Sequence, residues 1–194
     1  MKYSIQKLRE DFPVYLIENF KEVDLESRVN LVSLILQCKM TNQPPNVKGS
    51  FQVTIDYDNF FKKLYKNFLI VSQQLLGDYT RTSNHDSIWS YCSNKYDFVS
   101  IPGKIHNHLE TSTINSVYYL NIPDSVNEER GSLSLFLNHK ELIFTPKNGD
   151  LLIFPNYLDH RINNYNTDEN WRVSINMEIK CEESADELFS RIDT

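Results

Sequence analysis

The sequence predicts an α+β chain that is mainly β, with helices packed outside an antiparallel sandwich or jelly roll. Apolar residues first recur at helical spacing in two segments, 25–36 and 60–75. From Ile88 onward the pattern changes to six or seven short β-rich runs with turn residues between them. Helices that precede a run of strands are typical of a helical layer that covers a β core.

Length and composition are those of an ordinary globular chain. A chain of 194 residues suits one domain, in which we expect N-terminal support (1–87), a core with the functional site (88–179) and a C-terminal helix or tail (180–194). Apolar residues make up 40% and charged residues 24%, which disfavours disorder. The net charge of -6 argues against a nucleic-acid binder, because phosphate contacts need a basic surface.

The chain carries no sequence signal for a membrane or for secretion. No run approaches the roughly 18 apolar residues of a membrane span, and the N-terminus lacks the apolar core of a signal peptide. Its three cysteines (Cys38, Cys92 and Cys181) are an odd number without zinc spacing. We therefore expect a cytoplasmic protein, whose oligomeric state the sequence leaves open.

Turn and capping residues divide the predicted elements. A strand is expected at 14–17, a helix after the capping residue Asp24, and a second helix that starts near Asp56 or Asp58 and ends at Gly77. The expected core strands are 88–92, 96–99, 117–120, 133–137, 141–145, 151–154 and 171–179. In the last of these, alternate residues place Arg172 and Ser174 on the face opposite Val173.

A candidate metal site begins at His108 and Glu110. Residues two apart in a strand point to the same side, so one imidazole and one carboxylate would share a space. His160, from a later strand, could supply a third ligand. Two histidines and one carboxylate on one side of a metal leave its other side open, which is typical of non-haem Fe(II) oxygenases.

A candidate anion clamp follows the last histidine of this set. Arg172 lies twelve residues after His160 on a predicted strand, and Ser174 lies two further on the same side. An arginine that points into an apolar barrel is costly unless an anion binds it, and its guanidinium can hold a carboxylate through two parallel hydrogen bonds.

The ordered set of segments between residues 88 and 177 resembles the Fe(II)- and 2-oxoglutarate-dependent dioxygenases, in their prolyl-hydroxylase-like and 2OG-Fe(II) oxygenase branch. The segments that carry the resemblance are Trp89, 108–110, 117–121, 131–133, 146–155, His160 and 172–176. This resemblance implies a double-stranded β-helix, a cupin-like jelly roll, with Fe(II) bound by His108, Glu110 and His160. It implies that Arg172 binds 2-oxoglutarate, helped by Ser174 and by Tyr119 or Tyr118. The implied reaction uses O2 to convert 2-oxoglutarate to succinate and to hydroxylate a substrate.

Two departures from the family pattern leave the ligand set open. The usual acidic ligand is aspartate, whereas this chain has Glu110. One branch carries a His-x-His pair before its strand, which here would be His106 and His108, with Ser116 in place of its glycine. We favour His108 with Glu110, and the alternative is that His106 and His108 both bind the metal while Glu110 lies outside the ligand set.

Other functions and the substrate also stay open. The alternatives are a cupin-like metal enzyme that does not use 2-oxoglutarate and a β-barrel that only binds a ligand. Trp89, Tyr91 and Tyr96 could line a pocket, although aromatic residues in strands more often belong to a core. A small molecule, a free amino acid or a peptidyl proline would each suit as substrate. His85 and His139 are expected at the surface, in a loop and in a turn.

Overall fold

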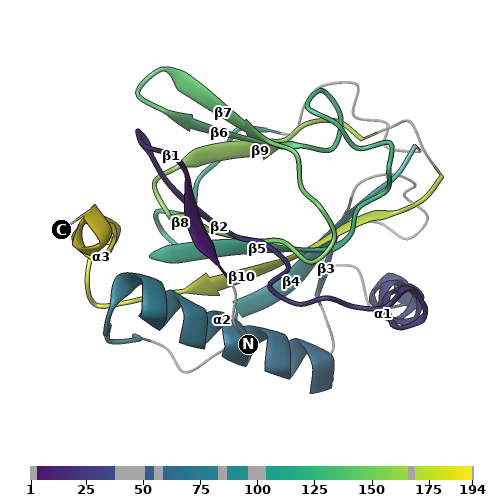
Figure 1. Cartoon of the computed structure of the whole chain (residues 1–194), viewed down its shortest axis with the longest axis horizontal. Coiled ribbons are helices and arrows are strands. Elements are labelled where there is room, and N and C mark those ends of the chain that lie inside the picture. Colours follow the sequence, from purple (N-terminus) through teal and green to yellow (C-terminus); the bar gives the residue numbers. More distant parts are fainter. Residues whose placement is uncertain are drawn as a thin grey trace.

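Two antiparallel sheets face each other in the computed structural model, which describes residues 4–37, 51–54, 59–82, 87–95, 104–165 and 169–193 (Figure 1). The larger sheet has seven strands and the smaller has three. In spatial order the larger sheet contains β1 (Ile5–Arg9), β2 (Phe12–Ile17), β8 (Leu151–Pro155), β5 (Ile114–Asn121), β10 (Arg172–Ile179), β4 (Ser87–Ser93) and β3 (Phe51–Thr54). The smaller sheet contains β7 (Lys140–Phe144), β6 (Leu133–Leu137) and β9 (Asp159–Ile162).

The chain passes repeatedly from one sheet to the other. After β5 in the larger sheet come β6 and β7 in the smaller sheet, then β8 in the larger, β9 in the smaller and β10 in the larger. Strands that alternate in this way between two facing antiparallel sheets form a jelly roll. The predicted mainly β, jelly-roll architecture is therefore confirmed.

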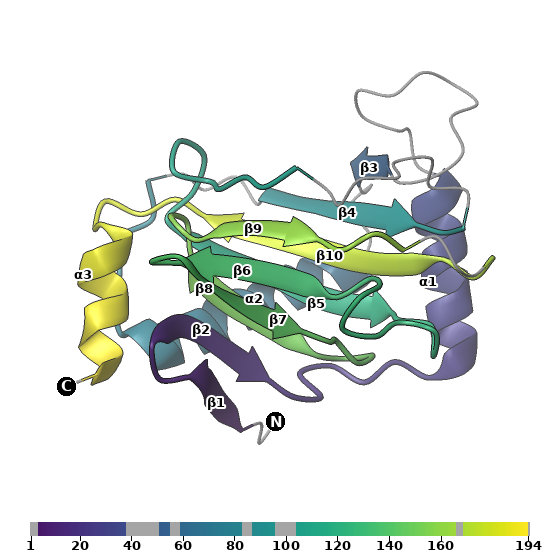
Figure 2. The ribbon, with the colours of Figure 1, turned by 90° about the horizontal axis from the view of Figure 1, so that it is seen from above.

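Helices cover the outer face and the ends of the larger sheet. They are α1 (Leu25–Gln37), α2 (Asn59–Leu76) and α3 (Ala185–Ser190), which a 3-10 turn, η1 (Arg191–Asp193), follows. Figure 2 shows α1 and α3 at opposite ends of the sheets. No helix in the described segments is long and apolar enough to cross a membrane.

The helix ends follow from local chemistry, as the sequence predicts. The Asp24 carboxylate accepts a hydrogen bond from the Ser27 backbone N–H (2.8 Å), which satisfies one of the free donors at the start of α1. Gly77 follows the last residue of α2 with a φ of 75°, a left-handed conformation that favours glycine. Both predicted helices are thereby confirmed, and α2 is described from Asn59 onward, while Asp56 and Asp58 lie outside the described residues.

The larger sheet separates two apolar cores. On its helix-covered face, Val173, Ile175 and Met177 of β10 pack with buried residues of α1 and α2. On its other face, a second core lies between the sheets and includes Val117, Tyr119, Leu135, Leu152 and Phe154. The predicted alternation along β10 is confirmed, so that Arg172 and Ser174 face the space between the sheets.

The N-terminal part of the chain contributes more to the sheet than the sequence indicates. Strand β1 was not predicted, because the segment Ile5–Arg9 is mostly polar and pairs on one side only, at the edge of the sheet. Strand β3 was also missed. The strand predicted at 96–99, together with Tyr96, His85 and Cys38, lies outside the described residues.

Candidate active site

Three histidines converge at one end of the space between the sheets. The potential ligand atoms of His106, His108 and His160 all lie within 4.8 Å of one another. His160 is on β9, and His106 pairs with it through two backbone hydrogen bonds of 2.8 and 3.1 Å. His108 follows two residues later, and its backbone N–H donates to the Asn156 carbonyl (2.9 Å). Backbone pairing thus brings the three imidazoles together.

Each of these imidazoles has its Nδ1 atom engaged by an oxygen. In His106 and His160, Nδ1 lies 2.9 Å from the backbone carbonyl two residues earlier. In His108, Nδ1 lies 2.9 Å from Oε1 of Glu178. Carbonyls only accept hydrogen bonds, and an ionised carboxylate does the same, so in a neutral imidazole these contacts favour the tautomer with the proton on Nδ1 and a lone pair on Nε2. Three neighbouring imidazoles in this tautomer would be a suitable ligand set for a transition metal.

Burial keeps His160 in its neutral form. Its side chain lies beside the Phe154 ring, with the ring centroids 5.2 Å apart, and it is only 7% exposed. Desolvation lowers the pKa of His160 to about 3, and the neighbouring His106 and His108 act in the same direction. A neutral imidazole is the form that binds a metal, so the protein presents this ligand without first removing a proton.

The structure does not bring Glu110 to the histidine cluster. The prediction that His108 and Glu110 lie in one strand is wrong, because the chain turns at His108, whose carbonyl accepts hydrogen bonds from the Thr111 and Ser112 N–H groups (3.1 and 3.0 Å). Glu110 is an exposed residue of this turn. The third residue of the cluster is His106, as in the alternative His-x-His arrangement, and not Glu110.

Arg172 is a buried cation without an anionic partner among the described residues. Its side chain is 0% exposed, and its Nε donates to the Gly131 carbonyl (2.6 Å). Within the described part of the chain, its Nη1 has no hydrogen-bond partner. Burial lowers the pKa of this guanidinium, and the nearby tyrosines, Tyr119 first among them, counteract that effect. A buried charge is stable only when paired, so this site favours an anionic ligand.

Two hydroxyls share this face with Arg172. Ser174 and Tyr119 are directly opposite each other on β10 and β5, both are 0% exposed, and neither hydroxyl has a partner among the described groups. The Tyr119 ring lies 5.7 Å from the guanidinium carbon of Arg172. Burial raises the pKa of Tyr119, so its hydroxyl stays protonated and can donate. A guanidinium with two hydroxyls is a group of donors that suits a carboxylate.

Tyr118 points away from this group. Its hydroxyl donates to the Lys21 carbonyl (2.7 Å), and its ring packs in the core on the helix-covered face. Neighbouring residues of a strand point to opposite faces, so only one of the two tyrosines can reach the space between the sheets. Of the two candidates that the sequence left open, the structure places Tyr119 beside Arg172.

Other sequence candidates lie on β4 and in the turn after β6. Trp89 and Tyr91 of β4 are partly buried and are paired in register with Asn176 and Ser174, so they share the face that carries Arg172. His139 is exposed in the turn between β6 and β7, as predicted.

Glu178, which contacts His108, was not among the residues predicted for the site. A signal was available, because Glu178 continues the alternation of polar residues that begins at Arg172 and runs along β10.

Gly131 holds Arg172 in place, and its substitution is expected to be costly. Gly131 has a φ of 73°, and a Cβ atom there would lie 3.0 Å from Val126, 3.1 Å from Tyr165 and 3.3 Å from Arg172. We expect Gly131→Ala to lower the free energy of unfolding by about 1–3 kcal/mol, through backbone strain and crowding. Chemical denaturation would measure this. Gly77→Ala is the matched control, since Gly77 has a φ of 75° but its Cβ position meets no described atom within 4 Å apart from its own neighbours in the chain, and it should cost less.

A jelly roll with three clustered histidines, and with a buried arginine that has no anionic partner among the described residues, is the arrangement expected of a metal-dependent enzyme that binds a carboxylate. Residues 87–178, which span β4 to nearly the end of β10, match the family model described as "Putative 2OG-Fe(II) oxygenase". Over this segment, a little under half of the chain, the sequence is similar to the 2-oxoglutarate- and Fe(II)-dependent oxygenases, an enzyme family that takes its name from these two cofactors. No curated protein matches the sequence.

Solved structures of such enzymes share the fold. A prolyl hydroxylase from Trichoplax adhaerens, in complex with a peptide fragment of the hypoxia-inducible factor, is 18% identical with a TM-score of 0.66, covering 91% of this chain and 87% of that one. A prolyl-4-hydroxylase from Pseudomonas putida is 14% identical with a TM-score of 0.60, covering 89% and 95%. HygX from Streptomyces hygroscopicus, with nickel and 2-oxoglutarate bound, is 10% identical with a TM-score of 0.65, covering 87% and 83%.

Proposed function

We propose that this chain is an Fe(II)- and 2-oxoglutarate-dependent hydroxylase whose iron is held by His106, His108 and His160. The observation that carries this proposal is the convergence of three imidazoles whose Nδ1 atoms are all engaged, which leaves three Nε2 atoms for one metal. When bound together, Fe(II), 2-oxoglutarate and O2 supply the oxidising chemistry that couples decarboxylation to succinate with hydroxylation of a C–H bond.

In this proposal, the remaining residues between the sheets bind and orient the cosubstrate. Arg172 pairs with a carboxylate of 2-oxoglutarate, and the hydroxyls of Ser174 and Tyr119 donate to the same carboxylate. The apolar side chains of the inner core, such as Val117 and Leu135, exclude water from this region. Binding of the dianion therefore satisfies several buried polar groups at once, which gives 2-oxoglutarate an advantage over a neutral ligand.

This burial pattern favours the proposal over its alternatives. A cupin-like metal enzyme without 2-oxoglutarate would leave the Arg172 guanidinium buried without an anion, at a cost of several kcal/mol. A barrel that only binds a ligand would not require three histidines whose potential ligand atoms lie within 4.8 Å of one another. One cosubstrate accounts for both features, because its carboxylate can pair with Arg172 while the rest of it reaches toward the metal.

The substrate is proposed to be a small molecule or a peptide segment. Ile105 and Leu109, which flank the two histidines in sequence, are 45% and 53% exposed and offer apolar contacts at the rim of the metal site. One structural relative, the Trichoplax adhaerens enzyme, was solved with a peptide, which supports a peptide as one of these classes. We also propose that the protein is cytoplasmic, because its three cysteines are an odd number without paired spacing, which is typical of a reducing compartment.

Anaerobic spectroscopy followed by a product assay tests the function. Addition of Fe(II) and 2-oxoglutarate to the metal-free protein should give a weak visible charge-transfer band that neither addition gives alone. On exposure to O2, succinate should form only when both are present, even without substrate. Iron binding without the band or succinate would favour a metal enzyme that does not use 2-oxoglutarate, and an absence of iron binding would contradict the whole proposal.

A further inference from the structure

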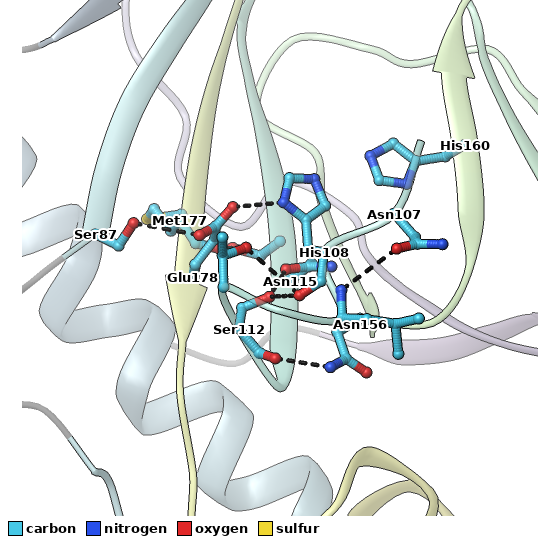
Figure 3. Close-up of polar contacts among 12 residues, drawn as sticks. Ser87, Asn107, His108, Ser112, Asn115, Asn156, His160, Met177 and Glu178 are labelled. Carbon is cyan, nitrogen blue, oxygen red and sulfur yellow. Dashed lines mark hydrogen bonds and ion pairs between the residues drawn. The ribbon is translucent and has the colours of Figure 1, made fainter. Parts of the chain in front are cut away.

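A carboxylate lies directly behind one of the three histidines. Oε1 of Glu178 is 2.9 Å from Nδ1 of His108, and the two side chains are only 12% and 16% exposed. Figure 3 shows the His108 ring between this carboxylate and His160. The second carboxylate oxygen accepts a hydrogen bond from the Ser87 hydroxyl (3.4 Å). Glu178 does not belong to the group of three histidines, so its carboxylate contacts a proposed metal ligand rather than the proposed metal position.

The fold holds Glu178 from several sides. It lies near the end of β10, where its backbone is paired with Asn115 of β5 on one side and with Ser87 of β4 on the other. The Tyr65 hydroxyl of α2 donates to its carbonyl (2.8 Å). A carboxylate on a strand that is paired on both sides is more precisely placed than one on a loop. The contact with His108 is therefore a fixed feature of the sheet.

The charge of the cluster gives this contact a role. Three neutral imidazoles bring no charge to a divalent metal, whereas two histidines and one carboxylate bring one negative charge. A carboxylate that accepts the Nδ1 proton of a ligating histidine fixes its tautomer and orientation and makes it a stronger donor.

We propose that Glu178 is a positioning residue for the metal centre. It holds His108 with Nε2 free, and it supplies through the imidazole the negative charge that the three-histidine set lacks. This inference rests on the proposed function, because it assumes that the three histidines bind the metal.

Metal affinity tests the inference without any need for turnover. The full-length, metal-free protein would be titrated with Co(II), with visible d–d absorption and calorimetry as readouts. Glu178→Gln keeps a hydrogen-bond acceptor of nearly the same shape but removes the charge, and it should lower the affinity about 10- to 100-fold. Glu178→Asp keeps the charge but withdraws it by one methylene, so an intermediate affinity is expected. Glu182→Gln removes an exposed carboxylate four residues after Glu178 and should leave the affinity unchanged.

Two further readouts separate a positioning role from a merely structural one. The melting temperature of metal-free Glu178→Gln should stay close to that of the wild type, while the Fe(III)/Fe(II) reduction potential should rise, since a negative charge near the iron stabilises Fe(III). If Glu178→Gln does not melt cooperatively, Glu178→Asp provides the comparison.

The outcomes also distinguish this inference from the proposed function. Wild-type affinity and an unchanged potential in Glu178→Gln would overturn the role of Glu178 while leaving the three-histidine site intact. A loss as large as that of His160→Ala would mean that Glu178 binds the metal directly, which overturns the positioning role as well. A wild-type protein that binds no Co(II) would instead overturn the proposed metal site itself.

Discussion

His106→Ala is expected to lower the affinity of the protein for Fe(II) by more than about 100-fold. Loss of a residue that only hydrogen-bonds to a metal ligand costs about 10- to 100-fold in metal affinity, and loss of a ligand itself should cost more. His106 is one of three imidazoles whose ligand atoms lie within 4.8 Å of one another. With only His108 and His160 left, two protein ligands would hold the metal. Anaerobic equilibrium dialysis with metal analysis would measure the effect.

Glu110→Ala is the matched comparison, because the two residues represent the two ligand sets that the sequence leaves open. Glu110 is exposed in a turn, so its loss should leave iron affinity within about threefold of wild type, as is usual for surface substitutions. His160→Ala serves as the positive control, since both ligand sets include this residue. Iron retained by His106→Ala and lost by Glu110→Ala would show that the chain uses His108 with Glu110, and that the loop rearranges to bring that carboxylate inward.

The sequence predicts the residues on β10 well, because strand alternation is a local property. Arg172 and Ser174 face the inner core and Val173 faces the helices, as the period of two requires. His160 was likewise expected on a strand and lies on β9. At these positions the pattern of apolar and polar residues alone determines which side chains face the site.

The same rule fails at His108 and Glu110, where the chain leaves the extended conformation. The Asn107 side chain accepts a hydrogen bond from the Leu109 N–H (3.4 Å), and the backbone groups of Thr111 and Ser112 then close the turn on His108. Asparagine in a short polar segment is compatible with either a turn or a strand end. Only the pairing of His106 with His160, which are 54 residues apart in sequence, decides where the extended segment ends.

Contacts between distant strands explain the other gaps in the prediction. The alternation along β10 predicts that Glu178 faces the inner side of the sheet. It does not predict the contact with His108, because that contact depends on the register that pairs Glu178 with Asn115. The choice between Tyr118 and Tyr119 depends on the same pairing, in which an irregularity between Val173 and Ser174 shifts the register. Such registers arise from the packing of the whole sheet, which a single sequence does not reveal.

Replacement of Arg172 by leucine is expected to remove 2-oxoglutarate binding while iron stays bound. Arg172 is fully buried and has an Nη1 atom without a partner in the described residues, so the cosubstrate would supply its counter-ion. Truncation of one partner of a buried, hydrogen-bonded charge pair costs about 2–5 kcal/mol, or about 30-fold or more in affinity. Leucine fills much of the same volume, which limits the damage to the core.

Thermal melting in the presence of Fe(II), with and without 2-oxoglutarate, separates these effects. At 100 times its Kd, the cosubstrate should stabilise the wild type by about 2.7 kcal/mol. For a chain of this size that corresponds to a rise in Tm of about 5–11 °C, and Arg172→Leu should show no rise at the same concentration. Without 2-oxoglutarate its Tm should stay close to that of the wild type, because the lost hydrogen bond to Gly131 is offset by removal of a buried, unpaired charge.

Arg172→Lys is the control that distinguishes charge from geometry. Lysine keeps the positive charge but lacks the planar fork that binds a carboxylate through two parallel hydrogen bonds, so its affinity for 2-oxoglutarate should lie between those of wild type and Arg172→Leu. Equal affinities in all three proteins would show that Arg172 has no part in binding the cosubstrate. All of these substitutions leave the three histidines in place. Loss of iron from Arg172→Leu would therefore indicate that the buried guanidinium stabilises the barrel and does not serve the cosubstrate site alone.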